Sequence, residues 1–274
     1  SAISLSVSPP LLELMIQPGK EVKQTYTITN NGGDVILTPK VIYFTPADEA
    51  GNIDLTEDSA PNWIKYSKDP INIKDSNKTN FNVIFSPPDN IEEVDHYLTL
   101  IFESKEPTDL LDDNSSLYKS QIGTNILLTI SKDGSPKKSA DVVEFSAPRV
   151  VDSFLNPISY ILKLSNNGNS YWKPIGKIIV GEESLKLAPQ NIISGSKRKI
   201  SCLDNENLID CKLDKKFRIG KIVSRLEFSI DDDPKIYKNE ATTYAIPFSL
   251  VGIIISLLTI FKLSITMKLW RRRK

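Results

Sequence analysis

The alternation of apolar and polar residues predicts short β-strands along most of the chain. Apolar and polar side chains alternate in residues 26–30, and Phe81, Val83 and Phe85 fall on one face of residues 81–85. Turn signals rich in Gly, Pro, Asn and Asp separate further predicted strands at residues 40–44, 97–103, 123–130, 141–145, 160–164, 177–180 and 226–230. Residues 108–120 are the best candidate for a helix or a loop. This rhythm is typical of immunoglobulin-like (Ig-like) β-sandwiches, so we predict an all-β fold for residues 1–240.

An internal repeat predicts two related sandwiches. Residues 26–44 and 160–180 each contain a strand with Tyr at its start, an Asn-Asn-Gly sequence, a proline and a strand rich in Val and Ile. Asn and Gly tolerate positive φ, so Asn-Asn-Gly predicts a tight reversal between strands. Pro39 and Pro174 lack an amide donor and are expected at a strand start or a sheet edge. We place the two sandwiches at residues 1–138 and 139–240, divided at the polar linker of residues 132–139.

The C-terminal segment, residues 241–274, predicts one membrane-spanning helix. No charge occurs from Ala245 to Phe261, and apolar residues continue beyond Lys262. A helix of about 20 residues crosses the hydrocarbon core of a bilayer, so residues 245–266 fit if the side chain of Lys262 reaches towards the headgroups. Tyr244 and Trp270 are placed like interfacial aromatic anchors. The alternative is a buried core helix of a soluble domain.

The charge distribution predicts the orientation of this helix. Over the whole chain 34 basic residues balance 34 acidic ones, but the residues after Glu240 include no acid. This C-terminal segment contributes a charge of +6, from Lys262, Lys268, Arg271, Arg272, Arg273 and Lys274. The preceding part therefore carries −6, which gives it no general attraction to nucleic acid. Basic residues directly after a span predict a cytoplasmic C-terminus and an extracellular N-terminal part at the cell membrane.

The start of the chain is consistent with export. The first residue is Ser1 rather than Met, and strand-like sequence follows at once. A removed secretory signal peptide explains this start, although trimming of the chain would look the same.

Few residues predict chemistry. The chain has one histidine and two cysteines, which argues against a zinc cluster or a Ser-His-Asp site, so we predict no catalytic, cofactor or metal site and no enzymatic activity. Cys202 and Cys211 enclose eight residues and are candidates for a disulfide that closes a hairpin, with two free thiols as the alternative. His96 follows acidic residues that could share a metal with it, but a solvated loop is the favoured interpretation.

Three aromatic residues are candidates for contact with a ligand. Trp63, Tyr171 and Trp172 follow or flank predicted loops, where aromatic rings commonly bind sugars and proteins. Trp172 is the better candidate for exposure because it lies between a loop and Pro174. For a Trp in such a fold, burial in a sandwich core is the favoured interpretation.

Several short segments resemble a known family. Residues 6–9 (SVSP), 18–19 (PG), 27–30 (TITN) and 47–54 (ADEAGNID) are similar to the N-terminal domain of Gram-positive surface proteins that interact with WxL-domain proteins. The resemblance implies two Ig-like domains, one membrane helix and a basic tail. It also implies that the first domain binds peptidoglycan or a WxL protein and that the second binds host matrix.

These features together predict a binding role at the cell surface. We expect a membrane-anchored extracytoplasmic protein that tethers a cell-wall polymer or another surface protein, as in adhesion, through its Ig-like domains. The alternative is an accessory single-pass subunit of a membrane complex, in which Thr259 and Lys262 pack against partner helices.

Overall fold

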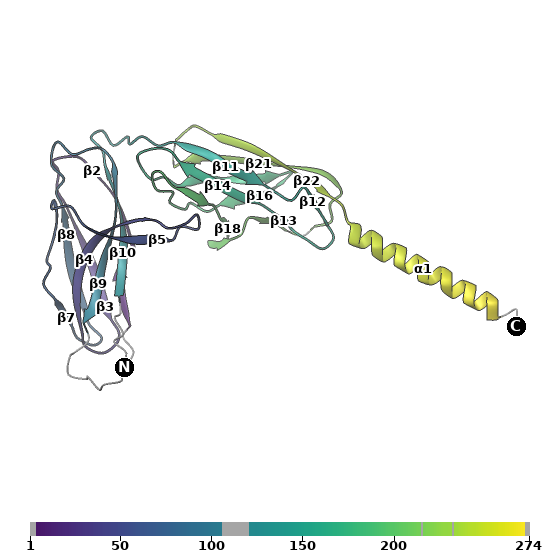
Figure 1. Ribbon diagram of the computed structural model, residues 1–274, viewed down its shortest axis with the longest axis horizontal. Helices are drawn as coiled ribbons and strands as arrows, with labels where there is room; N and C mark the ends of the chain where they lie inside the picture. The colour runs from purple at the N-terminus through teal and green to yellow at the C-terminus, as the bar shows by residue number, and fades with distance from the viewer. Residues whose placement is uncertain (1–3, 106–120, 215, 232, 272–274) are drawn as a thin grey trace. The chain divides into compact units, whose positions relative to one another are not determined.

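The computed structural model describes residues 4–105, 121–214, 216–231 and 233–271 (Figure 1). The candidate helix or loop at residues 108–120 therefore lies outside the described residues, as do Arg272, Arg273 and Lys274. The chain divides into two compact units, and the main division falls between Lys138 and Ser139, inside the predicted linker. The first unit comprises Ser1–Lys138, Asn167–Tyr171 and Ile193–Ser196, and the second comprises the rest.

The first unit is a sandwich of two sheets. One sheet has the strand order β1-β3-β8-β6, with β1 at Leu5–Ser8, β3 at Val22–Asn30, β8 at Lys78–Phe85 and β6 at Ile64–Tyr66. The other has the order β2-β10-β9-β4-β5, with β2 at Leu11–Ile16, β10 at Gln121–Ile130, β9 at Asp95–Lys105, β4 at Val35–Pro46 and β5 at Ile53–Ser59. A short strand, β7 at Ile71–Ile73, also pairs with β4. The facing orders correspond to strands A-B-E-D and G-F-C of an Ig-like sandwich, which confirms the predicted fold class.

The core of this sandwich follows from the alternation seen in the sequence. Phe81, Val83 and Phe85 are all buried on the inner face of β8, as predicted. They face buried residues of β9, and the rings of Phe81 and Phe102 meet edge to face with their centroids 5.3 Å apart. Burial of such rings removes a large apolar area from water and holds the two sheets together.

The second unit is also a sandwich of two sheets, but it contains more strands, and several of them have only two or three residues. One sheet has the order β11-β14-β17, with β11 at Ala140–Ser146, β14 at Ile161–Asn166 and β17 at Lys197–Lys199. The other has the order β12-β22-β21-β15-β16-β18-β19, with β12 at Val150–Val151, β22 at Tyr237–Ala245, β21 at Gly220–Ile230, β15 at Pro174–Val180, β16 at Glu183–Leu187, β18 at Cys202–Asp204 and β19 at Asn207–Ile209. A separate pair joins β13 at Ile158–Ser159 to β20 at Lys212–Leu213. Strands β15 and β21 approach closely at Gly176, where a Cβ would collide with the backbone of Glu227.

The repeated Asn-Asn-Gly sequence marks equivalent buried asparagines in the two sandwiches. Asn30 ends β3, and its Nδ2 donates to the carbonyl oxygens of Gly33 at 2.9 Å and Ile73 at 3.2 Å. Asn166 ends β14, and its Nδ2 donates to the carbonyl oxygen of Ile192 at 2.8 Å. Both asparagines are fully buried. Each side chain thus connects the end of one strand to the segment that leads into its antiparallel partner, β8 or β17.

The two prolines of the repeat occupy different places. Pro174 is the first residue of β15, one of the two predicted positions. Pro39 lies inside β4, a central strand, where its missing amide is tolerated for a local reason. On the side of β4 away from β9, β7 pairs only as far as Leu37 and β5 begins to pair at Ile42. Pro39 falls in this gap, where no ladder partner requires its amide hydrogen.

The C-terminal segment forms the helix α1 at Phe248–Arg271 (Figure 1, yellow). Its stretch Phe248–Met267 has a mean hydropathy of 2.2, and it is the one helix in the described residues that is long and apolar enough to cross a membrane. Lys262 lies within this stretch.

The predicted start of the span at Ala245 is wrong. Ala245 is the last residue of β22, where it is buried and pairs with Gly220 and Val151. Tyr244, predicted as an interfacial anchor, belongs to the same strand and not to the helix. Hydropathy cannot separate a buried apolar strand end from the helix that follows it, whereas the ladder hydrogen bonds do.

Candidate functional site

Trp172 is not an exposed binding residue. Its side chain is fully buried in the core of the second sandwich, and its Nε1 donates to the carbonyl oxygen of Ser139 at 3.3 Å. Its backbone also forms an isolated bridge to Ile192. This bridge fixes the backbone so that the indole ring enters the core, and the expectation of exposure is therefore wrong.

Trp63 and Tyr171 are both half-buried and belong to the first unit. Trp63 packs against the first core, and its ring meets the ring of His96 edge to face with centroids 5.2 Å apart. The backbone amide of Tyr171 donates to Oδ2 of Asp95 at 2.6 Å. The three aromatic candidates therefore do not share one site.

His96 has a structural environment. Its Nδ1 lies 3.0 Å from the hydroxyl of Tyr43, and its Nε2 is buried without a hydrogen-bond partner in the described part of the chain. Burial lowers the pKa of His96, and the charges of Asp95 and Glu92 oppose this effect. Within the described residues no three His, Cys, Asp or Glu side chains gather as a metal site.

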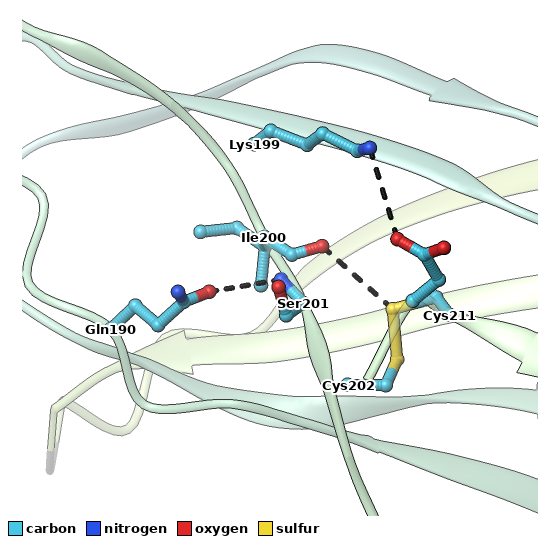
Figure 2. The surroundings of a disulfide bond; sticks show 7 residues. Gln190, Lys199, Ile200, Ser201, Cys202 and Cys211 are labelled. Atoms are coloured by element: carbon cyan, nitrogen blue, oxygen red, sulfur yellow. Dashed lines mark hydrogen bonds and ion pairs between the residues drawn. A yellow bond between two sulfur atoms is a disulfide. The ribbon is translucent and has the colours of Figure 1, made fainter. Parts of the chain in front are cut away.

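Cys202 and Cys211 form a disulfide bond in the second core (Figure 2). The bond joins Cys202, the first residue of β18, to Cys211, which follows Asp210 after the end of β19. It therefore closes the hairpin of β18 and β19. Beside it, Oε1 of Gln190 accepts a hydrogen bond from the amide of Ser201 at 2.9 Å. Lys199 forms an exposed ion pair with Asp210 at 4.0 Å. Both sulfurs are buried, so the bond has a structural role and is not an exposed reactive group.

One hollow of the first sandwich lies between β4 and the edge strand β6. We call it the β4–β6 groove, and it has a volume of about 590 Å³. On the side of β4 away from β9, β7 pairs with β4 only as far as Leu37, and β5 begins to pair at Ile42. The groove lies beside this unpaired part of β4. The hydroxyl of Tyr66 accepts a hydrogen bond from the amide of Val41 at 3.1 Å and limits one end of the opening. Its lining includes Pro39, Lys40, Pro61, Lys65, Tyr66, Lys68 and Glu103.

The β4–β6 groove is locally basic although residues 1–240 carry a net negative charge. Lys40, Lys65 and Lys68 are exposed, and in the described part of the chain none of the three forms an ion pair. Glu103 is the one acidic residue of the lining, and its Oε1 accepts a hydrogen bond from Gln121 at 3.0 Å. This site could not be predicted from the sequence, because its lysines come from two segments that only the sandwich brings together. The local sequence indication of this basic site is that two lysines, Lys65 and Lys68, lie on either side of Tyr66 within four residues.

A second hollow lies on the outer face of the other sheet. Its volume is about 320 Å³, and it is lined by residues of β5, β9 and β10. Leu55 and Ile101 provide apolar surface, while Thr99 and Asn125 are bonded to each other at 2.9 Å. With no charged residue in its lining, this hollow offers less to a polar ligand than the β4–β6 groove does.

The fold and the groove define the chain as a two-sandwich Ig-like protein with one apolar C-terminal helix. No protein-family model matches the sequence. No curated protein matches it either.

Solved structures to which the chain is similar include pilus chaperones. The class 5 fimbriae chaperone CfaA is 10% identical, with 87% of this chain and 99% of that chain covered and a TM-score of 0.44. The E. coli chaperone DraB is 11% identical over 87% of this chain and 97% of that chain, with a TM-score of 0.42. A CsuC–CsuE chaperone–tip subunit complex from Acinetobacter baumannii is 13% identical over 76% and 93%, with a TM-score of 0.38.

Proposed function

We propose that this chain is a membrane-anchored binding protein whose first sandwich holds a partner in the β4–β6 groove. The observation that carries the proposal is the groove itself, which combines a volume of about 590 Å³ with three unpaired lysines. The helix α1 fits a single-pass anchor. The basic residues that follow its apolar stretch favour sandwiches outside the cell and a C-terminus in the cytoplasm. The proposed role is binding and not catalysis.

The chemistry of the groove favours an extended partner that carries acidic groups. The lysine ammonium groups would pair with carboxylates or phosphates, and the rings of Pro39, Pro61 and Tyr66 would contact the apolar parts of the partner. An acidic segment of another surface protein and an acidic cell-wall polymer both meet this description. These are the partner classes that the resemblance to WxL-interacting proteins implies. Anchoring raises the effective concentration of the groove at the cell surface, so weak contacts become persistent.

The test is a pull-down from a cell-envelope fraction with the full chain in nanodiscs. The double variant Lys40→Glu/Lys65→Glu reverses the charge of the groove, and we expect it to lose roughly tenfold or more of the captured partner. The matched control is Lys20→Glu/Lys23→Glu, which makes the same charge change at exposed positions of the first sandwich outside the groove. Equal capture by both variants and the unchanged chain would overturn the assignment to this groove.

The alternative of an accessory membrane subunit has one supporting observation. Lys262 places a charge within the apolar stretch of α1, where a partner helix could contact it. The hydroxyl of Thr259 donates to the carbonyl oxygen of Ser256 at 2.8 Å in the same helix, so Thr259 does not require such a partner. Crosslinking in membranes separates the two roles. A stoichiometric partner that attaches to α1 favours the subunit, and a partner lost with the groove lysines favours the tether.

A further inference from the structure

The first turn of α1 is fastened to the second sandwich by Asp152. This carboxylate is buried, and its Oδ2 accepts hydrogen bonds from the amide of Ser249, at 3.2 Å, and from the hydroxyl of Ser249. Burial alone would raise the pKa of Asp152, but the hydrogen bonds from Ser249 and Phe154 lower it overall, so the group is charged at neutral pH. A negative charge at the start of a helix satisfies free amides and complements the helix dipole.

Three segments of the second sandwich meet at this point. The short strand β12 pairs with the end of β22, and the amide of Ile246 donates to the carbonyl oxygen of Val151 at 3.0 Å (Figure 1). The hydroxyl of Ser153 donates to the carbonyl oxygen of Arg218 at 2.5 Å, which holds residues 216–219 beside the turn after β12. Gly220, at the start of β21, then pairs with Ala245.

Large apolar side chains are exposed on all three segments. We call them the basal cluster, and they are Phe154, Leu155, Phe217, Ile219, Ile246 and Phe248. Phe217 and Ile219 are 60% and 69% exposed, although they flank a residue, Arg218, whose side chain is largely covered. Large apolar side chains exposed on segments that are bonded to one another in this way are typical of an interaction surface.

The length of α1 determines what this surface meets. The 20 residues of Phe248–Met267, at about 1.5 Å per residue, match the roughly 30 Å hydrocarbon core of a bilayer. Phe248 would therefore lie at the boundary between the acyl chains and the headgroups. Asp152 is hydrogen-bonded to Ser249, and Ser153 is hydrogen-bonded to Arg218, so the turn at residues 152–155 and the loop that carries Arg218 are held beside the first turn of α1, near the same boundary.

We propose that the basal cluster inserts into the headgroup–acyl boundary of the bilayer that α1 spans and so seats the second sandwich on the membrane surface. This inference rests on the anchoring in the proposed function and adds a second contact with the lipid. The charges agree with it. Arg218 and Lys216, which flank Phe217, both form ion pairs with the carboxylate of Glu183, at 2.7 and 2.9 Å, so neither of these two cations meets the boundary without an acidic partner. Exposed Arg149 and Lys221 flank Tyr244 through backbone pairing, a combination that suits the headgroup layer.

The test uses tryptophan fluorescence of the full chain in phosphatidylcholine vesicles, with and without bromine near the headgroup end of the acyl chains. Every variant carries Trp270→Phe to remove the indole at the far end of α1. The emission of the chain with Trp270→Phe alone, which comes from Trp63 and Trp172, is subtracted, so that the quenching is measured on the introduced indole. Phe217→Trp reports on the basal cluster. The matched control is Leu208→Trp, because Leu208 is 61% exposed on the hairpin of β18 and β19. Phe261→Trp reports on the span itself.

The expected result is quenching by about twofold for Phe217→Trp and Phe261→Trp, and little change for Leu208→Trp. Quenching of Phe261→Trp without quenching of Phe217→Trp would contradict the insertion of the basal cluster (the seat) and would leave the membrane span of α1 (the anchor) unaffected. Absence of quenching for Phe261→Trp would overturn the anchor and the seat together. Equal quenching of Phe217→Trp and Leu208→Trp would also overturn the seat, because it would show contact with lipid that is not specific to the basal cluster. Phe217 is largely exposed, so its replacement leaves the core unchanged.

Discussion

At the residue scale, the two tyrosines of the internal repeat are buried with different hydrogen bonding. The hydroxyl of Tyr160 lies 2.8 Å from the buried hydroxyl of Ser224. The hydroxyl of Tyr26 is buried and has no partner in the described residues. Burial raises the pKa of both phenols, so both remain protonated and each needs an acceptor. In the described residues, the phenol hydroxyl of the first core therefore has no hydrogen-bond partner, whereas the equivalent hydroxyl of the second core has one.

Removal of each hydroxyl should have opposite effects. Tyr26→Phe should leave the free energy of unfolding unchanged or raise it by up to about 1 kcal/mol, because it removes an unsatisfied group. Tyr160→Phe should lower it by about 1–2 kcal/mol, because the hydroxyl of Ser224 loses its partner. Denaturant unfolding of the full chain, followed by a probe in each sandwich, measures both. A loss of stability in Tyr26→Phe comparable to that in Tyr160→Phe would contradict the interpretation that the hydroxyl of Tyr26 has no hydrogen-bond partner in the folded chain.

The single histidine should make the first sandwich sensitive to mild acid. Burial holds the pKa of His96 below its ordinary value of 6.5, against the opposing charges of Asp95 and Glu92. The unfolded chain thus binds this proton more readily than the folded one, and stability is lost as pH falls below about 6.5 until it reaches the lowered pKa. We expect the melting temperature of the first sandwich to fall between about pH 7 and 5. His96→Gln should flatten that dependence. The second sandwich contains no histidine and serves as the internal control.

At the element scale, long strands with clear alternation could be predicted and short edge strands could not. The predicted segment at residues 81–85 lies within β8, where buried and less buried residues alternate. The segments at residues 97–103 and 123–130 lie within the long strands β9 and β10, where apolar residues are buried in succession. Strands such as β6 and β17 have three residues each, too few to show a period of two. They exist because partner strands bond to them, and this cause is not local in the sequence. The β4–β6 groove was missed for the same reason, since it is formed by the gap between two such pairings.

The buried asparagines explain why the repeat was detectable. Asn30→Ala should lower the free energy of unfolding of the first sandwich by about 2–4 kcal/mol, because it leaves the carbonyls of Gly33 and Ile73 without their donor. Asn31→Ala, at the neighbouring exposed position, should change it by less than about 0.5 kcal/mol. Urea unfolding of the two variants measures the difference. Similar values for both would show that the motif acts through backbone conformation alone.

The disulfide stabilises the part of the second sandwich that contains the short strands β18 and β19. It closes a loop with a sequence separation of 9, and the chain-entropy model assigns such a loop about 2–3 kcal/mol. Cys202→Ala/Cys211→Ala should therefore lower the melting temperature of the second sandwich and leave that of the first sandwich unchanged. Addition of a reductant to the unchanged chain should have the same effect once the buried bond is reached. A reductant effect on both sandwiches would contradict a local role.

At the scale of the whole molecule, the balanced net charge hides two oppositely charged parts. Residues 1–240 carry −6, and the segment that contains α1 and the tail carries +6. The unpaired lysines of the β4–β6 groove are therefore a local exception within an acidic part, which favours a partner recognised at one site over broad adsorption to polyanions. The basic segment instead suits the cytoplasmic face of a membrane. Under the proposed function, recognition would belong to the N-terminal unit and anchoring to the C-terminal helix.

This division of charge predicts a single orientation in the membrane. In intact cells that produce the full chain with an export signal, externally added protease should digest both sandwiches and leave a C-terminal tag intact, because basic residues after a span are retained in the cytoplasm. Replacement of Arg271, Arg272, Arg273 and Lys274 by Gln should raise the fraction of chains with an accessible tag, since only Lys268 then follows the apolar stretch. In the sequence the four substituted residues follow the last strand, β22, and the apolar stretch, so unchanged stability of the two sandwiches provides the control. Digestion of the tag in intact cells, with the sandwiches protected, would show the opposite orientation and place the groove in the cytoplasm.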